Sequence, residues 1–277
     1  MHDWMEELQE SHRVLDLGSG AGSLKSFGYP CLIVSVDCDS DAFARAYGGG
    51  SSVRHVVGWG GSLPFAASTF DLVLCNHVLE HVQDLTATLV EISRVLKPAG
   101  RLYVAVPNGH GLCDSIYRYL FEGGDHVNRF GRHELTTLVE STIGVRLTAW
   151  QKLYSSFSYL SRLADLKPSV VLTLAPRLRK LAAFPSSLLI AVQVLLYVLT
   201  RLADWLAGVD WALYGWALYF EHIVPIDVRE DRPYLNVCLY CGSGHATNEL
   251  RRRFVIIYKC PTCDHFGFYF PRFRNAR

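Results

Sequence analysis

Four cysteines toward the C-terminal end of the sequence have the spacing of metal ligands. They form two CxxC pairs separated by 18 residues: Cys238, Cys241, Cys260 and Cys263. A tight turn lets each pair bring two thiolates to one ion, and four thiolates make the closed, tetrahedral shell of a structural zinc site. The intervening "RRRFVIIYK" is strand-like, so we predict a zinc ribbon. The alternative is reduced thiols that hold no metal.

A glycine-rich turn follows an apolar run near the start of the sequence. In "VLDLGSGAG", Asp16 lies within the run, and Gly18, Gly20 and Gly22 come after it. Such a turn allows a ligand to approach the backbone, with NH groups of a helix N-terminus directed at it. The dinucleotide fingerprint GxGxxG is incomplete because position 23 is serine, so a nicotinamide or flavin site is only the second interpretation.

A second acid, Asp37, ends the next apolar run, "LIVSVD". At the end of a strand in a doubly wound sheet, a carboxylate can accept hydrogen bonds from both ribose hydroxyls of a nucleotide. Acids at two adjacent strand ends are more specific for a nucleotide than a glycine turn alone. Taken singly, each aspartate can equally be a residue that ends a strand and caps the next helix.

Several histidines fall where loops are expected after strands. His110 in "PNGHG" and His126 in "GGDHVNRF" are our candidate general bases, with His77 as a weaker one, because an imidazole titrates near neutral pH. His126 can equally bond the backbone of a turn. His81 and His133 fall in helical patterns, where a cap or a surface position is the simplest interpretation.

The elements that must position these residues alternate between strands and helices from Val14 to about Ala149. Strand patterns occur in "RVLDL", "LIVSVD", "DLVLCN", "RLYVAV" and "VRLTAWQKL", and helical patterns in "DLTATLVEISRVL" and in "RHELTTLVESTIG", which stops at Gly144. Strands that alternate with helices predict an α/β fold with a doubly wound, parallel sheet covered on both faces.

The block that follows is apolar. Residues 181–200 contain no charge, which is close to the length of a membrane span, but Pro185 and Gln193 argue against one. The next segment, "RLADWLAGVDWALYGWALYF", has apolar residues at helical spacing and is predicted to be amphipathic. We interpret the block as a helical insertion that roofs a pocket or packs on a partner. Peripheral membrane contact through 181–220, and a true span, are the alternatives.

Four segments taken in order resemble the motifs of class I S-adenosylmethionine-dependent methyltransferases, in the branch with the ubiquinone/menaquinone-type enzymes. They are "VLDLGSGAG", "VSVDCD", "SLPFAASTFDLVLCNHVLEHV" and "RVLKPAGRLYVAVPN". The resemblance covers residues 13 to about 150 and returns at about 233. It implies a seven-stranded, Rossmann-like sheet whose last strand is antiparallel, and "YLNVCLY" is where we expect that strand.

The resemblance also implies roles for residues of the site. The methionine end of S-adenosylmethionine would lie against Asp16, Gly18, Ser19 and Gly20, its ribose on Asp37, and its adenine against Cys38. The methyl-donor pocket would be lined by Asn76 and His77.

One position departs from this pattern. The family usually places an acid and a small residue before its LPF motif to bind the adenine amino group, but this sequence has Trp59 and Gly60 there. Either Trp59 stacks on the adenine or a backbone carbonyl accepts from its amino group.

These observations predict three regions: a methyltransferase core at 1–153, the apolar helical insertion at 154–230, and a last core strand running into the zinc ribbon at 231–277. We expect methyl transfer to a small, lipophilic or lipid- or saccharide-linked acceptor, with a base needed only if the acceptor must lose a proton. The alternatives are an RNA or DNA methyltransferase that grips its substrate with the ribbon, and a binding scaffold whose cofactor site has decayed.

Composition agrees with a folded enzyme. Of 277 residues, 50% are hydrophobic and 19% charged, which excludes a disordered chain, and the net charge of +1 does not imply nucleic acid. Arg251, Arg252 and Arg253 could contact phosphate, but we favour a solvated hairpin end. The remaining four cysteines occur singly, as in a reducing compartment. The segment "MHDWMEELQE" lacks the features of a secretory signal, so we expect a cytoplasmic location, with membrane association as an option.

Overall fold

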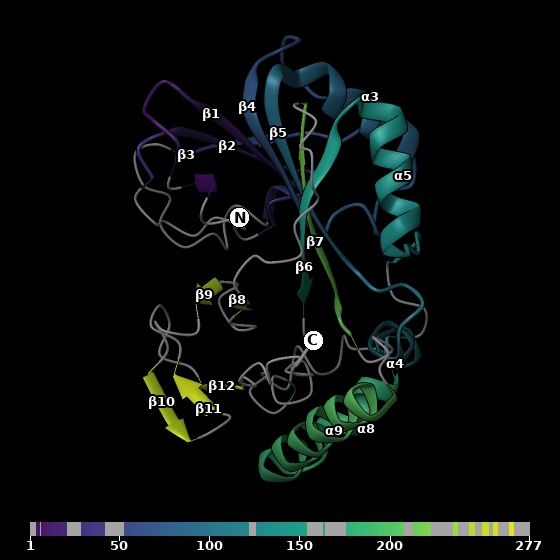
Figure 1. Cartoon of the computed structure of the whole chain (residues 1–277). Coiled ribbons are helices and arrows are strands. Elements are labelled where there is room, and N and C mark those ends of the chain that lie inside the picture. Colours follow the sequence, from purple (N-terminus) through teal and green to yellow (C-terminus); the bar gives the residue numbers. More distant parts are fainter. Residues whose placement is uncertain are drawn as a thin grey trace. The chain divides into compact units, whose positions relative to one another are not determined.

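The structure is a computed structural model of the chain (Figure 1). It describes residues 4–5, 7–20, 29–41, 53–121, 126–153, 163, 176–207, 213–222, 235–237, 244–246, 251–254, 257–259 and 266–268. The chain divides into two compact units, which we describe separately. The first consists of Met1–Gly109, Asp125–Lys152 and Gly215–Arg232, and the second of His110–Gly124, Leu153–Tyr214 and Pro233–Arg277.

A seven-stranded sheet forms the first unit, with the strand order β3-β2-β1-β4-β5-β7-β6. Its strands are β1 (Arg13–Leu17), β2 (Leu32–Asp37), β3 (Val53–Val57), β4 (Phe70–Asn76), β5 (Leu96–Pro107), β6 (Arg146–Leu153) and β7 (Gly215–Glu221). Strand β1 is parallel to both β2 and β4, and β7 is antiparallel to β5. The predicted α/β fold with an antiparallel strand in a seven-stranded sheet is therefore confirmed.

Local sequence explains most elements of this unit. Strands β1, β2 and β4 are buried along most of their length, as strands covered on both faces must be, and their near-continuous apolar runs meet that need. Helix α3 (Leu85–Val95) starts at Asp84, whose side chain accepts a hydrogen bond from the Ala87 backbone NH at 2.9 Å. Helix α5 (Arg132–Ile143) stops at Gly144, as predicted, because its φ of 81° is left-handed.

Two helices in the described part of the first unit lie side by side. Helix α3 packs against α5, and both are seen together beside the sheet in Figure 1. The buried side chains of α3 are Thr88, Leu89, Ile92 and Val95, and those of α5 are Leu135, Val139 and Ile143. A helix that covers a sheet usually packs on it through a buried, mainly apolar face of this kind.

Our placement of the seventh strand was wrong. We expected it at "YLNVCLY", whereas the strand beside β5 is β7, Gly215–Glu221, which we had read as part of an amphipathic helix. A short, wholly apolar run fits a buried strand and a buried helix equally well, so periodicity could not decide. Close packing against β5 explains the glycine at the start of β7, because a Cβ on Gly215 would lie 2.8 Å from the Cα of Pro107.

In the second unit the described helices are α4 (Leu112–Leu120), α8 (Pro176–Ala182) and α9 (Ser186–Ala207). Helices α8 and α9 fall between β6 and β7 in the chain, where we expected a helical insertion, but the predicted range of 154–230 extends too far because Gly215–Glu221 is a strand of the large sheet. Pro185 precedes α9 and its carbonyl accepts hydrogen bonds from the NH groups of Leu188 and Leu189. Proline therefore begins this helix rather than interrupting it.

Two small antiparallel sheets also belong to the second unit. One pairs β8 (Leu235–Val237) with β9 (Gly244–Ala246), so part of "YLNVCLY" is a strand, but outside the large sheet. The other has the order β10-β11-β12, from Arg251–Phe254, Ile257–Lys259 and Phe266–Phe268. The strand-like segment between the CxxC pairs is thus confirmed as β10 and β11, with the three arginines on β10. All four CxxC cysteines lie outside the described residues, and the zinc ribbon stays a prediction.

Candidate active site

The turn after β1 depends on glycine at two positions. Gly18 and Gly20 have φ values of 61° and 52°, in the left-handed region that side chains disfavour. Space is a second constraint at Gly18, since a Cβ there would lie 2.5 Å from Cγ2 of Val78. Gly22 lies outside the described residues. The turn therefore brings the end of β1 against the loop that follows β4.

Asp37 ties this turn to the end of β2. Its Oδ2 accepts a hydrogen bond from the Gly20 NH at 2.7 Å, and its Oδ1 accepts one from the Asp39 NH at 2.9 Å. The Ser19 NH donates to the carbonyl of Val36 at 3.0 Å. Because a carboxylate offers about four lone-pair positions, Asp37 can hold the turn and still accept from ligand hydroxyls. The structure thus brings together Ser19, Gly20 and Asp37, which the sequence had placed in one site.

The loop after β3 comes to the same edge of the sheet. The Gly58 NH donates to the carbonyl of Asp37 at 3.0 Å, and the Ser62 NH donates to that of Trp59 at 3.0 Å, closing a turn around Gly60. The side chain of Trp59 is 71% exposed. The exposed ring of Trp59 is therefore in the loop next to Asp37. A ring that stacks on the adenine of a nucleotide bound at Asp37 would have to lie in this region. That stacking, and the role of the exposed Cys38, stay predictions.

An ion pair on α3 holds the LPF segment, and our sequence reasoning missed it. Glu91 accepts from the Leu63 NH at 2.7 Å and pairs with Arg94 at 2.6 Å. Arg94 also donates to the carbonyls of Leu63 and Phe65 at 3.0 and 2.7 Å. The hydrogen bonds from Arg94 lower the pKa of Glu91 to about 2. An acid and a base three residues apart on a helix was the available signal.

The loop after β4 is strained at His77. This residue has a φ of 58°, and its NH donates to the carbonyl of Ala105 at 2.9 Å. Its Nδ1 lies 3.1 Å from Oε1 of Glu80, whose side chain is 2% exposed. Strain of this kind is concentrated at functional sites, so the observation agrees with placing Asn76 and His77 at the methyl-donor pocket.

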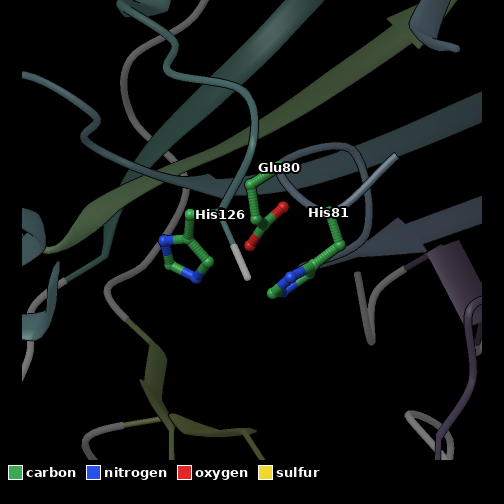
Figure 2. A group of neighbouring side chains, drawn as sticks. All are labelled: Glu80, His81 and His126. Carbon is green, nitrogen blue, oxygen red and sulfur yellow. The ribbon is translucent and has the colours of Figure 1, made fainter. Parts of the chain in front are cut away.

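Glu80 is the centre of a group that also contains His81 and His126. One ligand-type atom from each of the three side chains lies within 4.8 Å of the others, and Figure 2 shows the carboxylate between the two rings. The rings of His81 and His126 meet edge to face, with their centroids 4.8 Å apart. Our helical interpretation of His81 was wrong, because its NH closes a turn onto the carbonyl of Val78 at 2.9 Å. The predicted base His126 therefore has a buried carboxylate beside it.

Asn128 fixes the two loops that carry this group. Its side-chain amide donates to the carbonyls of Leu79 and Val82 at 2.9 and 2.6 Å, and its backbone NH donates to that of Glu80 at 3.0 Å. Three hydrogen bonds from one residue join segments 46 to 49 positions apart. The group is consequently held in place before any ligand binds.

The two predicted bases belong to different units. His126 lies in the first unit, whereas His110 is exposed and lies at the start of a segment of the second. His133 is exposed on α5, as we expected of a surface residue. Glu80 was not among the predicted site residues, although its place between Asn76, His77 and His81 in "NHVLEH" was a usable signal.

Buried negative charge is the main electrostatic feature of the first unit at this edge. Asp16 is fully buried and Glu80 is 1% exposed. Burial raises the pKa of the Cys75 thiol well above its ordinary value, and the charges of Asp16 and Glu80 raise it further. Two carboxylates near the ends of β1 and β4 favour a ligand that carries positive charge.

Comparison with known proteins agrees with this geometry. Residues 15–104 match the family model described as a methyltransferase domain. The chain contains an S-adenosylmethionine-dependent methyltransferase domain. This match spans β1 to most of β5 and includes Asp16, Asp37 and the "NHVLEH" loop.

Relatives and solved structures extend the likeness. The uncharacterized methyltransferase YcgJ of Bacillus subtilis is 29% identical over 54% of this chain and 58% of its own length. Demethylmenaquinone methyltransferase of Corynebacterium glutamicum is 39% identical over 36% of this chain and 43% of its own length. The chain therefore spans about half the length of these relatives.

A solved structure shares the fold. Phosphoethanolamine N-methyltransferase 2 of Haemonchus contortus, in complex with S-adenosyl-L-methionine, superposes with a TM-score of 0.53 at 16% identity over 79% of this chain and 50% of that one. At this identity the likeness concerns the fold alone. It agrees with the Rossmann-like methyltransferase architecture of the seven-stranded sheet.

The residues at the strand ends fit S-adenosylmethionine in their chemistry. The cosubstrate has a positively charged sulfonium and ammonium, and buried Asp16 supplies negative charge at the end of β1. Asp37 keeps acceptor capacity for ribose hydroxyls beside the Gly20 turn. The open side of Gly20, where a Cβ would meet nothing within 4 Å, leaves room for a ligand at the backbone.

Proposed function

We propose that this protein transfers the methyl group of S-adenosylmethionine to a small lipophilic or lipid-linked acceptor at the surface of a membrane. The observation that carries the proposal is the exposed apolar face of α9. The name of one relative, demethylmenaquinone methyltransferase, indicates a lipophilic acceptor for that protein and supports the same class here.

Helix α9 exposes the side chains that a soluble helix buries. Leucines are spaced three, four or seven residues apart along its outer face, and Trp205 stands beside them. The exposed large side chains are Leu188 45%, Ile190 45%, Val192 38%, Leu195 56%, Leu199 51%, Leu202 46%, Trp205 69% and Leu206 69%. Apart from two serines in its first turn, every exposed residue of this helix is apolar. A continuous apolar surface of this kind marks a site of contact with another apolar body.

The inner face of α9 is the polar one. Its buried side chains are Leu189, Gln193, Tyr197 and Thr200, and its charged residues Arg201 and Asp204 are half-buried. Tyr197 packs in a cluster with Cys113 of α4. The helix therefore has its apolar residues outside and its polar residues inside, the reverse of an amphipathic helix at the surface of a protein in water. Its outer face is stabilised only where water is excluded.

Basic side chains near this apolar face favour an anionic bilayer as its binding partner. Helix α8, which directly precedes α9, exposes Arg177, Arg179 and Lys180. Arg177 lies 4.2 Å over the ring of Tyr119, and the other two are available to lipid headgroups. Basic side chains beside an apolar helix face are the usual combination for binding at a membrane surface.

The packing of α9 favours a helix that lies in the membrane plane. By length and composition it is the described helix that could cross a bilayer. However, its inner face packs on α4 and α8, and α4 carries the Asp114–Arg118 ion pair at 2.8 Å. A spanning orientation would take these charges into hydrocarbon, which costs several kcal/mol, of order 2 to 4 for each charge. An in-plane orientation leaves them in water.

At the catalytic site the protein mainly aligns donor and acceptor. The methyl group of S-adenosylmethionine is activated by its positive sulfur, and displacement from it takes one step. In our proposal Asp16 and the NH groups of Ser19 and Gly20 hold the methionine end, while Asp37 holds the ribose. His126 and Glu80 lie beside the methyl-donor pocket and take part in removing a proton where the acceptor has to lose one.

Flotation of the full chain with lipid vesicles tests the membrane component. We expect binding to vesicles that contain phosphatidylglycerol, and weaker binding to neutral phosphatidylcholine vesicles or in high salt. Leu195→Glu with Leu199→Glu should reduce vesicle binding about tenfold or more, because two exposed leucines that the proposal places in the bilayer become charged. Arg179→Glu should reduce it by roughly fivefold.

A matched control separates this effect from added charge in general. Val90→Glu replaces a side chain of α3 that is 51% exposed, the same as Leu199, and should leave vesicle binding unchanged. Absence of vesicle binding by the native chain, together with a doubled mass in solution, would show that the face is a dimer interface and would refute the membrane contact. Resistance to alkaline extraction from membranes would instead indicate a spanning helix.

A further inference from the structure

The group formed by Glu80, His81 and His126 has the composition of a metal site. Two imidazoles and one carboxylate are the common ligands of divalent zinc, iron and cobalt when positions are left open for substrate. The three ligand atoms lie within 4.8 Å of one another, whereas ligands of one ion lie about 3.4 Å apart in a tetrahedral shell. Rotation of the half-buried imidazoles can close that difference.

Glu80 provides the second, independent observation. Its Oε1 accepts from His77, but its Oε2 is buried and has no hydrogen-bond partner among the described residues. An ionised carboxylate oxygen in this position is costly unless a cation or a donor meets it. In Figure 2 the carboxylate lies close to both the His81 ring and the His126 ring, and an ion shared by all three would lie in the space between their ligand atoms.

The surroundings hold these ligands as a metal site requires. Asn128 joins the turn of Glu80 and His81 to the segment of His126 through three hydrogen bonds. Phe130 adds another tie, since its carbonyl accepts from the Gly109 NH at 3.1 Å at the end of β5. His77 bonds the coordinating carboxylate from behind, as outer partners of metal ligands usually do.

We propose that Glu80, His81 and His126 bind one divalent first-row transition-metal ion. The site lies in the loop that follows Asn76 and His77, which we place at the methyl-donor pocket. An ion there would bind an oxygen of the acceptor and lower its pKa, which favours acceptors with a hydroxyl, phenol or enol oxygen. This role in selecting the acceptor rests on the proposed function, whereas the binding of the ion does not.

Zinc content at equilibrium tests the site without any enzymatic assay. The full chain and its variants are dialysed against the same free Zn²⁺ concentration, and zinc per chain is measured by elemental analysis. The CxxC pairs contribute equally to all samples, so only differences count. We expect Glu80→Gln and His126→Gln each to hold one zinc ion less than the native chain.

Controls keep this experiment decisive. His133→Gln changes an exposed histidine of α5 and should retain the full zinc content. Unchanged binding of S-adenosylhomocysteine by the variants shows that they are folded. Equal zinc content in the native chain and both variants would overturn the proposal and leave Glu80 as a hydrogen-bond partner of the histidines. Methyl transfer that persists with a vacant site would refute the acceptor role while leaving the proposed function intact.

Discussion

Helices α3 and α9 use the same kinds of residue in opposite ways. Helix α3 buries Leu89, Ile92 and Val95 and carries the Glu91–Arg94 ion pair at its surface. Helix α9 exposes leucines at positions such as 195 and 199 and buries Gln193 and Thr200. The first arrangement is stable in water by itself, and the second requires an apolar environment outside the helix. This difference supports our proposal that methyl transfer takes place in the first unit and contact with a lipid phase in the second.

Identical substitutions on the two helices should give the largest contrast. Leu89→Glu places a charge at a fully buried position and should unfold the protein or destabilise it by about 4 kcal/mol or more. Leu199→Glu should change the free energy of unfolding by less than about 0.5 kcal/mol, because that side chain is already half exposed. Thermal and urea denaturation of both variants measure the contrast. Similar losses would mean that the outer face of α9 is covered within the chain.

Enlarging one small residue in each region should give the next largest contrast. Gly18→Ala forces a side chain at a φ of 61° and against Val78, so it should cost about 2 kcal/mol and weaken S-adenosylhomocysteine binding about tenfold or more. Ala203→Leu enlarges an exposed residue of α9 and should leave stability and cosubstrate affinity unchanged while strengthening vesicle binding. Calorimetry gives the affinities. A Gly18→Ala protein with native affinity would refute the assignment of this turn to the cosubstrate.

Acid should weaken the ion pair between Glu91 and Arg94 on α3. The folded-state pKa of Glu91 is about 2, below its ordinary value of 4.5, because Arg94 donates hydrogen bonds to its carboxylate. Its contribution is therefore complete above pH 4.5 and is lost as the pH falls toward 2. For a surface-facing pair we expect about 1 to 2 kcal/mol. Stability measured between pH 7 and pH 2.5 should fall less in Glu91→Gln than in the native chain, and parallel curves would contradict the assignment.

The smallest effect should be a gain in stability from a substitution on the inner face of α9. Gln193 is 3% exposed, and its Oε1 has no hydrogen-bond partner among the described residues. Gln193→Leu should therefore raise stability by about 1 kcal/mol. Gln151→Leu is the matched control in the large sheet, where the Tyr219 hydroxyl lies 3.4 Å from Oε1 of Gln151, and it should destabilise. Destabilisation by both would show that Gln193 has a partner in solution.

Much of the first unit could be predicted because its signals are local. Buried strands produced apolar runs at β1, β2 and β4, and a left-handed stop at Gly144 produced a glycine. The edge strand β3 had no such signal because much of it is exposed, and β7 was misread because its apolar run of six residues, Gly215 to Phe220, has no distinctive period.

The site was only partly accessible to sequence reasoning for a different reason. The acids at the ends of β1 and β2 follow from the topology of the sheet, so Asp16 and Asp37 could be chosen in advance. The meeting of Glu80 with His126 depends on two loops joined by Asn128 across more than 40 positions, which no local pattern records. His110 resembled His126 in sequence context, yet the two lie in different units.

Transfer of a tritiated methyl group tests the central claim most directly. The native chain is incubated with S-[methyl-³H]adenosylmethionine and membranes of its expression host, and label is then partitioned between organic solvent and water. We predict label in a small lipid of the organic phase, at least tenfold more for the native chain than for Leu195→Glu with Leu199→Glu. Detergent-dispersed acceptor should restore transfer by that variant, because its catalytic unit is unchanged. Label that stays in the aqueous phase, or enters lipid equally with both proteins, would contradict the account.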